Sequence, residues 1–495
     1  MTVFARRRRI QTLVATVLLL FVVSRLYPLS GDADSSSYHF GWHPHGKGRP
    51  ALALPPDYDP YLEPAVSQSE YCNERFTPKY LDDFRTHAIQ YCAAGSTASL
   101  RCFQGHSRDE GAVDSLCIGQ GATLDLALGQ FTLDCELRNP DKNETNRGLI
   151  PFDQIKPEWY ESGPRWIFDH HLKVQRGPSD GATTRSASEG RPGNPQFALL
   201  VKRECNSNIW HCLMEIWTMM LTFDLLRTTP DPSRQGAAFF SDVADLTNTQ
   251  AIVLDDLSDG HLMDLWTIFT GRPPVRLADI LDDPEQARAF AEVPRNVIVP
   301  LAGAANPLWQ NDWVDHDCGH APTLRTFVRR VEAFYGISAE EGEREGDSPI
   351  TLTFVNRTGS RKLADQEALL AAVAAKHPHV RIQSVDFATL SFPEQIRVAR
   401  ATDVLLGVHG AGLTHTMFMR DGRGAVVEIR PATNDYRGFR NLAFMKGLHY
   451  FTALVEQIPA RGKVVKRDSW HWDDVRIGLD EFMGLVDAAI AAVSH

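Results

Sequence analysis

The chain has 495 residues, of which 43% are hydrophobic and 23% charged, and its formal net charge at pH 7 is -11. A chain of this length exceeds the size at which a single hydrophobic core stops growing, so two large domains are expected. The ordinary composition excludes a mostly disordered protein. The acidic balance argues against a nucleic-acid partner, because phosphate binding requires a basic surface.

The first thirty residues predict a membrane anchor. Arginines at positions 6–9 precede an apolar run at residues 10–23. Residues 26–29 extend that run past Arg25 to the length of about 20 residues that a spanning helix needs. The arginines should stay on the cytosolic side, which places the later residues in the lumen. A signal peptide cleaved near Ser24 is the alternative, and either reading makes this an exported protein.

We therefore predict a single-pass type II protein of the Golgi or ER membrane whose folded part is lumenal. The C-terminus, Ala-Ala-Val-Ser-His, lacks an ER-retrieval tetrapeptide, which favours the Golgi. The glycan acceptor pattern at Asn143 agrees with export. A second such pattern at Asn356 lies beside Arg357, in a stretch predicted to belong to a ligand site.

The cysteines also agree with export. Their even number and their density between residues 72 and 135 predict a loop-rich segment held by disulfides. The spacings of structural zinc sites are absent, so no metal is expected. The loop at residues 315–320, Asp-His-Asp-Cys-Gly-His, is interpreted as a domain-boundary loop fixed by a disulfide of Cys318. The eight cysteines are Cys72, Cys92, Cys102, Cys117, Cys135, Cys205, Cys212 and Cys318.

Three changes in composition divide the chain. A stretch rich in Pro, Gly, Ser and His predicts a stem, a second stretch at residues 176–195 predicts a mobile surface loop, and a charged, glycine-bearing stretch predicts a linker. The predicted parts are the cytosolic tail and anchor at 1–30, the stem at 31–68, an N-terminal domain at 69–338, the linker at 339–349 and a C-terminal domain at 350–495.

Strands and helices alternate after the linker. Such alternation predicts parallel βαβ units and a doubly wound α/β sheet. The expected strands are 350–355, 380–385, 404–408 and 425–429, and the expected helices are 365–376, 392–401, 413–419 and 477–493. The N-terminal domain shows a less regular alternation and is predicted as a second α/β domain. Its expected strands are 197–201 and 251–254, and its expected helix is 209–226.

The turn after the strand at 404–408 is a candidate phosphate site. Gly410 and Gly412 have no side chain, which lets a ligand approach the backbone. The amides of Gly410, Ala411 and Gly412 open a helix whose positive end suits a diphosphate. The alternative is a plain tight turn, but His409 at the strand end has little packing reason to be there. Ligands of open α/β sheets bind beyond the carboxyl ends of strands, where this turn lies.

Two arginines follow the strand at 350–355. Arg357 and Arg361 can both point into the crevice at the strand ends, and their guanidinium groups match phosphate oxygens. A solvated basic turn is the alternative, and the neighbouring glycine turn favours the binding reading. Glu428, at the end of the strand at 425–429, can accept hydrogen bonds from ribose hydroxyls, although a surface glutamate explains it nearly as well.

Residues 404–413, followed by Phe418 and 426–429, resemble the signature of glycosyltransferase family 61, most specifically over 350–455. Asn208-Ile209-Trp210-His211-x-x-x-Glu215 is similar to the family's Asn-x-x-His-x-x-x-Asp segment, with Glu215 in place of the aspartate. The resemblance implies a GT-B fold, in which two Rossmann-like domains face one cleft. It also implies inverting transfer of a sugar, GlcNAc or xylose, from a UDP-sugar to a hydroxyl of a protein or glycan. The N-terminal domain would then face the acceptor, and the C-terminal domain would bind the donor.

An inverting transferase needs a base for the acceptor hydroxyl, and His211 is the leading candidate. On a helix His211 and Glu215 share a face, so the carboxylate can orient the imidazole. A structural His–Glu pair is the alternative. Asp255 and Asp256 are the other candidates, as base or as metal ligands. They do not form an Asp-x-Asp motif, and helix and arginine charge can stabilise a diphosphate, so no metal or other cofactor is expected to be required.

Two rival functions remain. The first is a catalytically inactive lumenal protein of the same fold that binds a glycan or nucleotide, and the second is a hydrolase. The retention of both the arginine and the glycine motifs disfavours the first. No Gly-x-Ser-x-Gly motif and no carboxylate pair of recognisable spacing supports the second.

Overall fold

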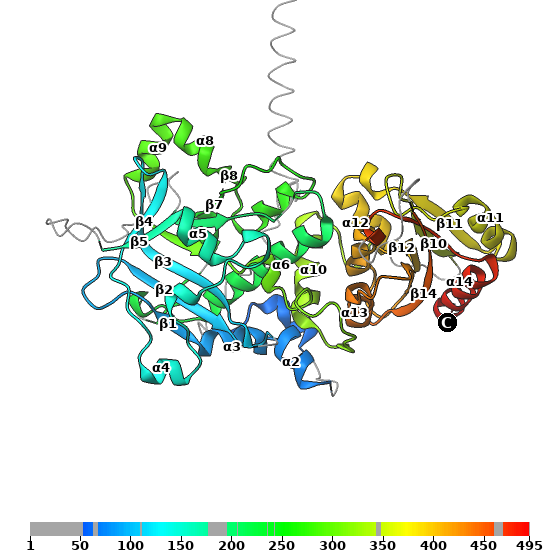
Figure 1. The fold of residues 1–495 in the computed structure, drawn as a ribbon, viewed down its shortest axis with the longest axis horizontal. Coiled ribbons are helices and arrows are strands. Elements are labelled where there is room, and N and C mark those ends of the chain that lie inside the picture. The colour runs from blue at the N-terminus through cyan, green and yellow to red at the C-terminus, as the bar shows by residue number, and fades with distance from the viewer. Residues whose placement is uncertain are drawn as a thin grey trace, which may run out of the picture. The chain divides into compact units, whose positions relative to one another are not determined.

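The computed structural model describes the chain at residues 53–62, 68–108, 111–176, 196–204, 206–234, 236–241, 243–342, 348–459 and 469–494. These residues belong to one contact unit that spans residues 40–495. The predicted anchor lies outside the described residues, as does the predicted mobile loop beyond residue 176. The structure holds two sheets, one on each side of the predicted linker in sequence (Figure 1).

The first sheet is mixed and has nine strands. Its strands are β1 (Ala88–Gln90), β2 (Ser99–Gly105), β3 (Asp114–Asp125), β4 (Gln130–Asp134), β5 (Leu172–Gln175), β6 (Phe197–Val201), β7 (Thr249–Val253), β8 (Val275–Arg276) and β9 (Arg295–Val299). The order is β1-β2-β3-β9-β6-β7-β8, with β4 beside β3 and β5 beside β4. The stretch from β9 through β6 and β7 to β8 is parallel, and β1, β2, β3 and β9 pair antiparallel.

The prediction of a loop-rich segment at residues 72–135 is wrong, because much of that segment forms helices and strands. The disulfide prediction is confirmed. Cys102–Cys117 joins directly opposed residues of β2 and β3, and Cys92–Cys135 closes the same region. Cys72–Cys318 fixes the loop at 315–320, as expected. In that loop Asp317 also pairs with Arg440 at 2.6 Å.

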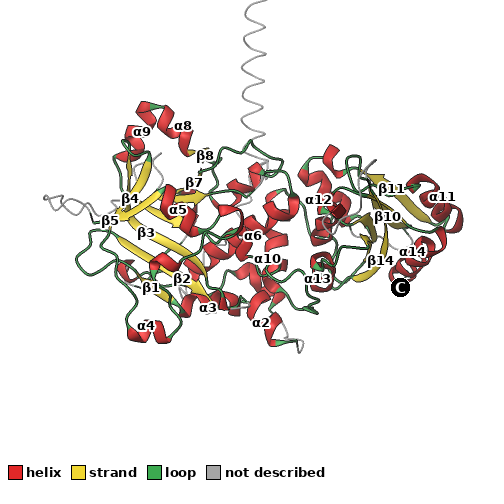
Figure 2. Cartoon of the chain, in the orientation of Figure 1, coloured by secondary structure: helices red, strands yellow, loops and turns green. Residues whose placement is uncertain are grey.

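Helices cover both faces of the first sheet (Figure 2). They are α2 (Glu70–Phe76), α3 (Lys79–Thr86), α4 (Lys142–Asn146), α5 (Pro164–His170), α6 (Ile209–Thr228), α7 (Val243–Thr247), α8 (Leu277–Asp282), α9 (Pro284–Ala291) and α10 (Pro322–Phe334). The predicted helix at 209–226 is confirmed as α6, which begins where the Asn208 side chain accepts a hydrogen bond from the Trp210 amide. Within the described residues α6 alone is long and apolar enough to cross a membrane, and 89% of its apolar window is buried in the protein.

The second sheet has six strands in the order β11-β10-β12-β13-β14-β15, and the first five are parallel. Its elements are β10 (Ile350–Val355), α11 (Gln366–Lys376), β11 (Val380–Val385), α12 (Phe392–Arg400), β12 (Val404–Val408), β13 (Ala425–Pro431), α13 (Gly438–Met445), β14 (His449–Ile458), β15 (Asp474–Arg476) and α14 (Leu479–Val493). The predicted alternation is confirmed. The expected helix at 413–419 is a 3-10 helix, η9 (Ala411–Phe418).

Each central strand buries both faces, because successive side chains point to opposite sides of a sheet. In β6, Leu199 packs in one core cluster, and Ala198 and Leu200 pack in another. In β12, Leu405 joins the cluster that holds Leu199, and Leu406 packs under α11 and α14. One core cluster therefore contains residues from both sheets, together with α6, α10, α12, α13 and η9.

The end of the predicted stem does not act as a spacer. A short 3-10 helix, η1 (Pro56–Tyr61), packs against the folded body, and Tyr58 is fully buried. The Tyr58 hydroxyl donates to Asp224 of α6 at 2.8 Å. Arg330 of α10 binds both Asp57, at 2.6 Å, and Asp224, at 2.8 Å. The predicted stem at 31–68 is thus wrong over residues 56–61, where buried ion pairs tie the chain to the core.

Candidate functional site

The strand order of the second sheet creates a crevice beside β10. This strand comes first in the sequence and lies between β11 and β12, so the connections leave it in opposite directions. Ligands of doubly wound sheets bind at such a switch point, beyond the carboxyl ends of the strands. We therefore expect a ligand site among the residues that follow the ends of β10, β11 and β12.

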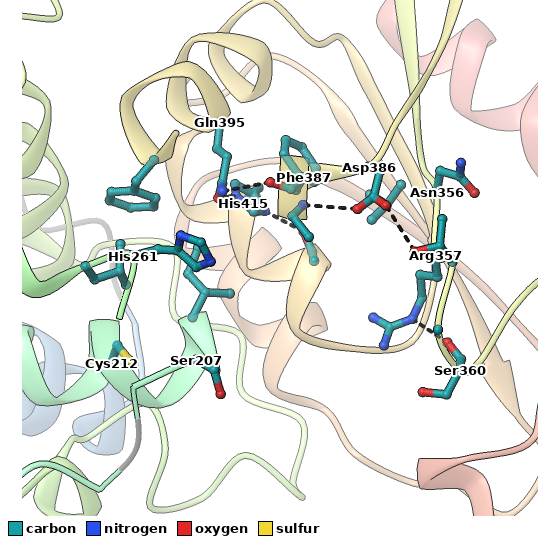
Figure 3. A pocket seen from close by; sticks show the side chains of 18 of the residues that line it. Ser207, Cys212, His261, Asn356, Arg357, Ser360, Asp386, Phe387, Gln395 and His415 are labelled. Carbon is teal, nitrogen blue, oxygen red and sulfur yellow. Dashed lines mark hydrogen bonds between the residues drawn. The ribbon is translucent and has the colours of Figure 1, made fainter. Parts of the chain in front are cut away.

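A cavity of about 460 Å³ lies at this point. That volume falls within the range of small-molecule sites, about 300–1,000 Å³. Residues 355–360 and 386–388, which follow β10 and β11, line one side of it. Ser207, Cys212 and His261, which precede the predicted linker, line the other, and Figure 3 shows them facing Arg357 and Asp386.

The two predicted arginines come together at Gly410. A Cβ atom added at Gly410 would lie 2.7 Å from Nη1 of Arg357 and 3.0 Å from Cζ of Arg361. Gly410 also has φ +151°, which disfavours other residues. The turn therefore admits two guanidinium groups against the backbone, whereas the sequence had predicted that its glycines leave room for a ligand.

Two like charges at close quarters are unfavourable without an anion. Burial, together with the positive charge of Arg357, lowers the pKa of Arg361 to about 10. Burial also lowers the pKa of Arg357, and the charge of Asp386 opposes that change. Among the described residues no hydrogen-bond acceptor meets Nε of Arg361. This arrangement suits an anion with several oxygens, such as a diphosphate.

Gly412 is required by its close packing against β10. A Cβ atom there would lie 2.6 Å from Cγ1 of Val355 in β10. The close approach lets η9 begin directly over the end of β10. Gly412 lines the cavity, and Ala411 next to it is half-buried. The amide of Leu413 already donates to Gly410 O at 2.9 Å within the turn.

His409 and Glu428 form a buried pair beneath the turn. Nδ1 of His409 lies 2.5 Å from Oε1 of Glu428, and the Tyr450 hydroxyl donates to Oε2 at 2.5 Å. Burial lowers the pKa of His409, and Glu428 opposes that change. Glu428 is 1% exposed, so its carboxylate holds neighbouring side chains instead of the ribose hydroxyls predicted for it.

His415 lies in the same motif and was missed by the sequence reasoning. Its Nδ1 lies 2.8 Å from Gly412 O, its Nε2 lies 2.8 Å from Oε1 of Gln395, and its ring stacks on Phe387 at 3.8 Å. Burial lowers the pKa of His415 to about 4. This ring links η9, α12 and the segment after β11, and so shapes one wall of the cavity (Figure 3). Its place five residues after Gly410 was the available signal.

The carboxylate beside His211 belongs to Glu204, not to Glu215. Nδ1 of His211 lies 3.4 Å from Oε2 of Glu204, whose side chain is fully buried. Glu215 accepts a hydrogen bond from the Glu204 amide at 2.7 Å, and so supports Glu204. The His211 ring also contacts Tyr160 and Trp309. His211 lies outside the cavity lining, between Ile209 and Cys212, which line it.

The two aspartates have different surroundings. Asp255 forms a bidentate ion pair with Arg203 at 2.7 Å, and both side chains are 3% exposed. It also accepts from the Arg203 amide at 2.8 Å. Its oxygens hold Arg203 in this structure, and the role of Asp255 as a base or metal ligand stays a prediction. Asp256 is exposed and lies outside the cavity lining.

A strained aromatic loop lies next to His211. Glu158, Tyr160 and Glu161 have φ of 57°, 56° and 54°, which are uncommon for residues other than glycine. The loop exposes Trp159 and Tyr160 by 46% and 56%. Strain of this kind persists where the surroundings enforce it, and it gathers at ligand sites. The adjacent aromatic pair was the only trace of it in the sequence.

Comparison with known proteins adds a family match. Residues 273–426, which include both arginines and the glycine turn, match the family model described as glycosyltransferase 61. The chain is 29% identical over 198 residues to an EGF domain-specific O-linked N-acetylglucosamine transferase of Gallus gallus, covering 38% of this chain and 35% of that one. The Drosophila melanogaster protein of the same name is 25% identical over 309 residues, covering 60% and 54%. The match thus spans about a third of the chicken protein and about half of the fly protein.

Proposed function

The chain belongs to glycosyltransferase family 61, and from that premise we propose that it transfers a sugar from a UDP-sugar to a hydroxyl of a protein or glycan, with inversion at the anomeric carbon. The names of its relatives favour N-acetylglucosamine over xylose as the sugar, and EGF-like domains as the acceptor. The single observation that carries the proposal is the pair of half-buried arginines at the switch point of a parallel sheet.

The donor would occupy the cavity beside β10, with its diphosphate at Arg357 and Arg361. Both guanidinium groups lie where the turn at Gly410 brings them together. A diphosphate relieves their mutual repulsion. As the sugar leaves, negative charge grows on the departing phosphate, and fixed positive groups stabilise that charge without reorganisation. Arginine charge can serve here without a metal ion.

His211 would act as the base. In the proposed step it accepts the proton of the acceptor hydroxyl as the hydroxyl oxygen bonds to the anomeric carbon. The bond between that carbon and the phosphate oxygen breaks on the opposite face, and its electrons leave with UDP. Glu204 stabilises the imidazolium that results, because its carboxylate lies 3.4 Å from Nδ1. The exposed loop with Trp159 and Tyr160 would contact the acceptor.

A type II arrangement in the Golgi or ER membrane belongs to the same proposal. Three disulfides support an oxidising compartment. The two sheets, one on each side of the predicted linker, support a GT-B arrangement with a donor-binding C-terminal domain at 350–495.

The test is UDP binding by Arg361→Ala. We expect affinity to fall by about 10- to 100-fold, since hydrogen bonds to charged groups contribute about 1.5–3 kcal/mol. Arg381→Ala is the matched control, because Arg381 is exposed on β11 of the same sheet. Isothermal titration calorimetry on both variants measures the affinity for UDP. Equal UDP affinity in Arg361→Ala and wild type would contradict the proposed donor site. Release of UDP from UDP-GlcNAc by the wild type separates a transferase from a binding protein.

A further inference from the structure

Three metal-ligating side chains gather far from the proposed donor site, at the carboxyl end of α3. Asp83 lies in the last turn of α3, His87 follows the helix, and His106 follows β2. One ligand atom from each lies within 4.8 Å of the others. This cluster was not predicted from the sequence, because Asp83, His87 and His106 do not follow the spacings of structural zinc sites.

The position of His106 indicates which of its nitrogens carries the proton. Nε2 lies 3.0 Å from Gly148 O, and a carbonyl oxygen accepts only from N–H, so Nε2 is protonated. In the neutral ring Nδ1 is then a bare lone pair. It is buried, meets no hydrogen-bond donor among the described residues, and lies 3.9 Å from Oδ1 of Asp83. A lone pair that faces a carboxylate oxygen is repulsive unless a proton or a metal ion lies between them, and the spacing of the three ligand atoms, within 4.8 Å of one another, leaves room for a metal ion.

A histidine that donates one N–H to a backbone carbonyl and offers the other nitrogen is the usual form of a metal ligand. His87 completes the set, with its Nδ1 2.9 Å from Oδ1 of Asp83 and its ring centroid 4.2 Å from that of His106. Tetrahedral zinc with bonds of about 2.0–2.1 Å separates its ligand atoms by about 3.3 Å. The two distances to Asp83 fall on either side of that value.

We propose that Asp83, His87 and His106 bind one Zn²⁺ ion, with water in the remaining position. Two imidazoles and one carboxylate favour zinc over the harder cations Mg²⁺ and Ca²⁺. Nδ1 of His87 also lies 2.8 Å from the backbone O of Asp83, to which it donates a hydrogen bond. Binding through Nδ1 replaces that proton, so zinc uptake releases a proton.

The ion would add to two hydrogen bonds that already connect these parts of the fold, from the His106 amide to Oδ2 of Asp83 at 2.6 Å and from the Gln104 amide to His87 O at 3.2 Å. It links the end of α3 to the end of β2, and through Gly148 O it reaches the turn after α4. Helix α3 also packs against α6, whose first turn carries His211. The ion would therefore stiffen the support of that helix without touching the proposed donor site, so the proposal does not depend on the proposed function.

The test uses the full chain without a polyhistidine tag, stripped with EDTA and then titrated with ZnCl₂. We expect one tightly bound Zn²⁺ per chain by elemental analysis after dialysis, and a rise in melting temperature with ZnCl₂ but not with MgCl₂. His106→Ala should weaken zinc binding at least tenfold and lose the rise. His377→Ala is the control. It removes a histidine that pairs with Asp487 at 2.6 Å beside the second sheet, outside the proposed zinc site.

A circular dichroism spectrum and a cooperative unfolding transition like those of the metal-free wild type would show that His106→Ala is folded, and His87→Gln serves in its place if it is not. The proposal is overturned if the wild type retains no zinc after dialysis, or if folded His106→Ala or His87→Gln binds zinc as the wild type does.

Discussion

Single side chains decide the chemistry around His211. Its neighbouring carboxylate comes from Glu204, which lies before α6 in the chain, and Glu215 acts only through the Glu204 amide. Periodicity on a helix predicts contacts within that helix, and it cannot find a partner that an adjoining loop supplies. The segment that contains the histidine was therefore predictable, whereas its partner was not.

His211→Ala should lower kcat by about 10²- to 10⁴-fold, the usual contribution of a general base, and leave UDP affinity unchanged. Glu204→Gln keeps the shape of the side chain but removes its charge, so it should lower kcat by a smaller factor with the same unchanged affinity. Steady-state kinetics and UDP titration on both variants provide the measurement. Asp256→Asn is the control, and a loss of turnover in that variant with full activity in His211→Ala would reassign the base.

Asp312 is a buried carboxyl that should make the stability of the fold depend on pH. Burial raises its pKa from 3.8 to about 8, and a hydrogen bond from Tyr436 opposes that rise. The fold therefore binds this proton more tightly than the unfolded chain does. Its contribution to stability is complete below about pH 4 and is lost as pH rises to about 8, by at most about 1.4 kcal/mol per pH unit.

Asp312→Asn should remove that dependence, so the variant gains stability relative to the wild type as pH rises from 4 to 8. Urea unfolding of both proteins across this range measures the difference. A difference that stays constant with pH would contradict the buried neutral carboxyl.

Elements of the second sheet were more predictable than those of the first. Parallel strands buried on both faces are continuous apolar runs, such as residues 404–408, and their ends set the position of the cavity. Strands β2 and β3 were missed because cysteines and glycines interrupt any apolar alternation there. The start of η9 lies close to β10 because Gly412 approaches Val355, which lies 57 positions earlier by residue number, and no local pattern contains that contact.

Gly412→Ala should push η9 away from β10 and lower stability by about 1–3 kcal/mol, as overpacking does. Val355→Ala has its own cost because Val355 is buried. Gly412→Ala should nevertheless cost less in the Val355→Ala background than in the wild type, because the atom that lies 2.6 Å from the new Cβ is gone. Gly359→Ala is the control: it lines the same cavity, and its added Cβ meets nothing within 4 Å. Unfolding of the two single variants and the double variant tests this, and an equal cost of Gly412→Ala in both backgrounds would contradict a packing role.

At the scale of the whole molecule, contacts between residues far apart in the sequence hold the elements together. One core cluster contains side chains from both sheets, and the Cys72–Cys318 disulfide joins residues 246 apart in sequence. Cys72→Ser with Cys318→Ser should therefore cost more stability than Cys102→Ser with Cys117→Ser, which opens a separation of 15 residues. The chain-entropy model gives about 3 kcal/mol for the shorter loop and about 5 kcal/mol for the longer one.

Denaturant unfolding of the two double variants under oxidising conditions compares these losses. Equal or reversed losses would show that local packing around each disulfide, rather than the closure of a long loop, sets its contribution.

The short helix η1 also sets where a soluble form of this protein can begin. A truncated protein that starts at residue 70 would lack Tyr58 and Asp57, and would leave a hole against α6 and α10 together with an Arg330 that has lost one of its two carboxylates. A truncation that starts at residue 53 keeps the helix and both ion pairs. For expression, secretion and crystallisation, the useful boundary therefore lies on the N-terminal side of η1.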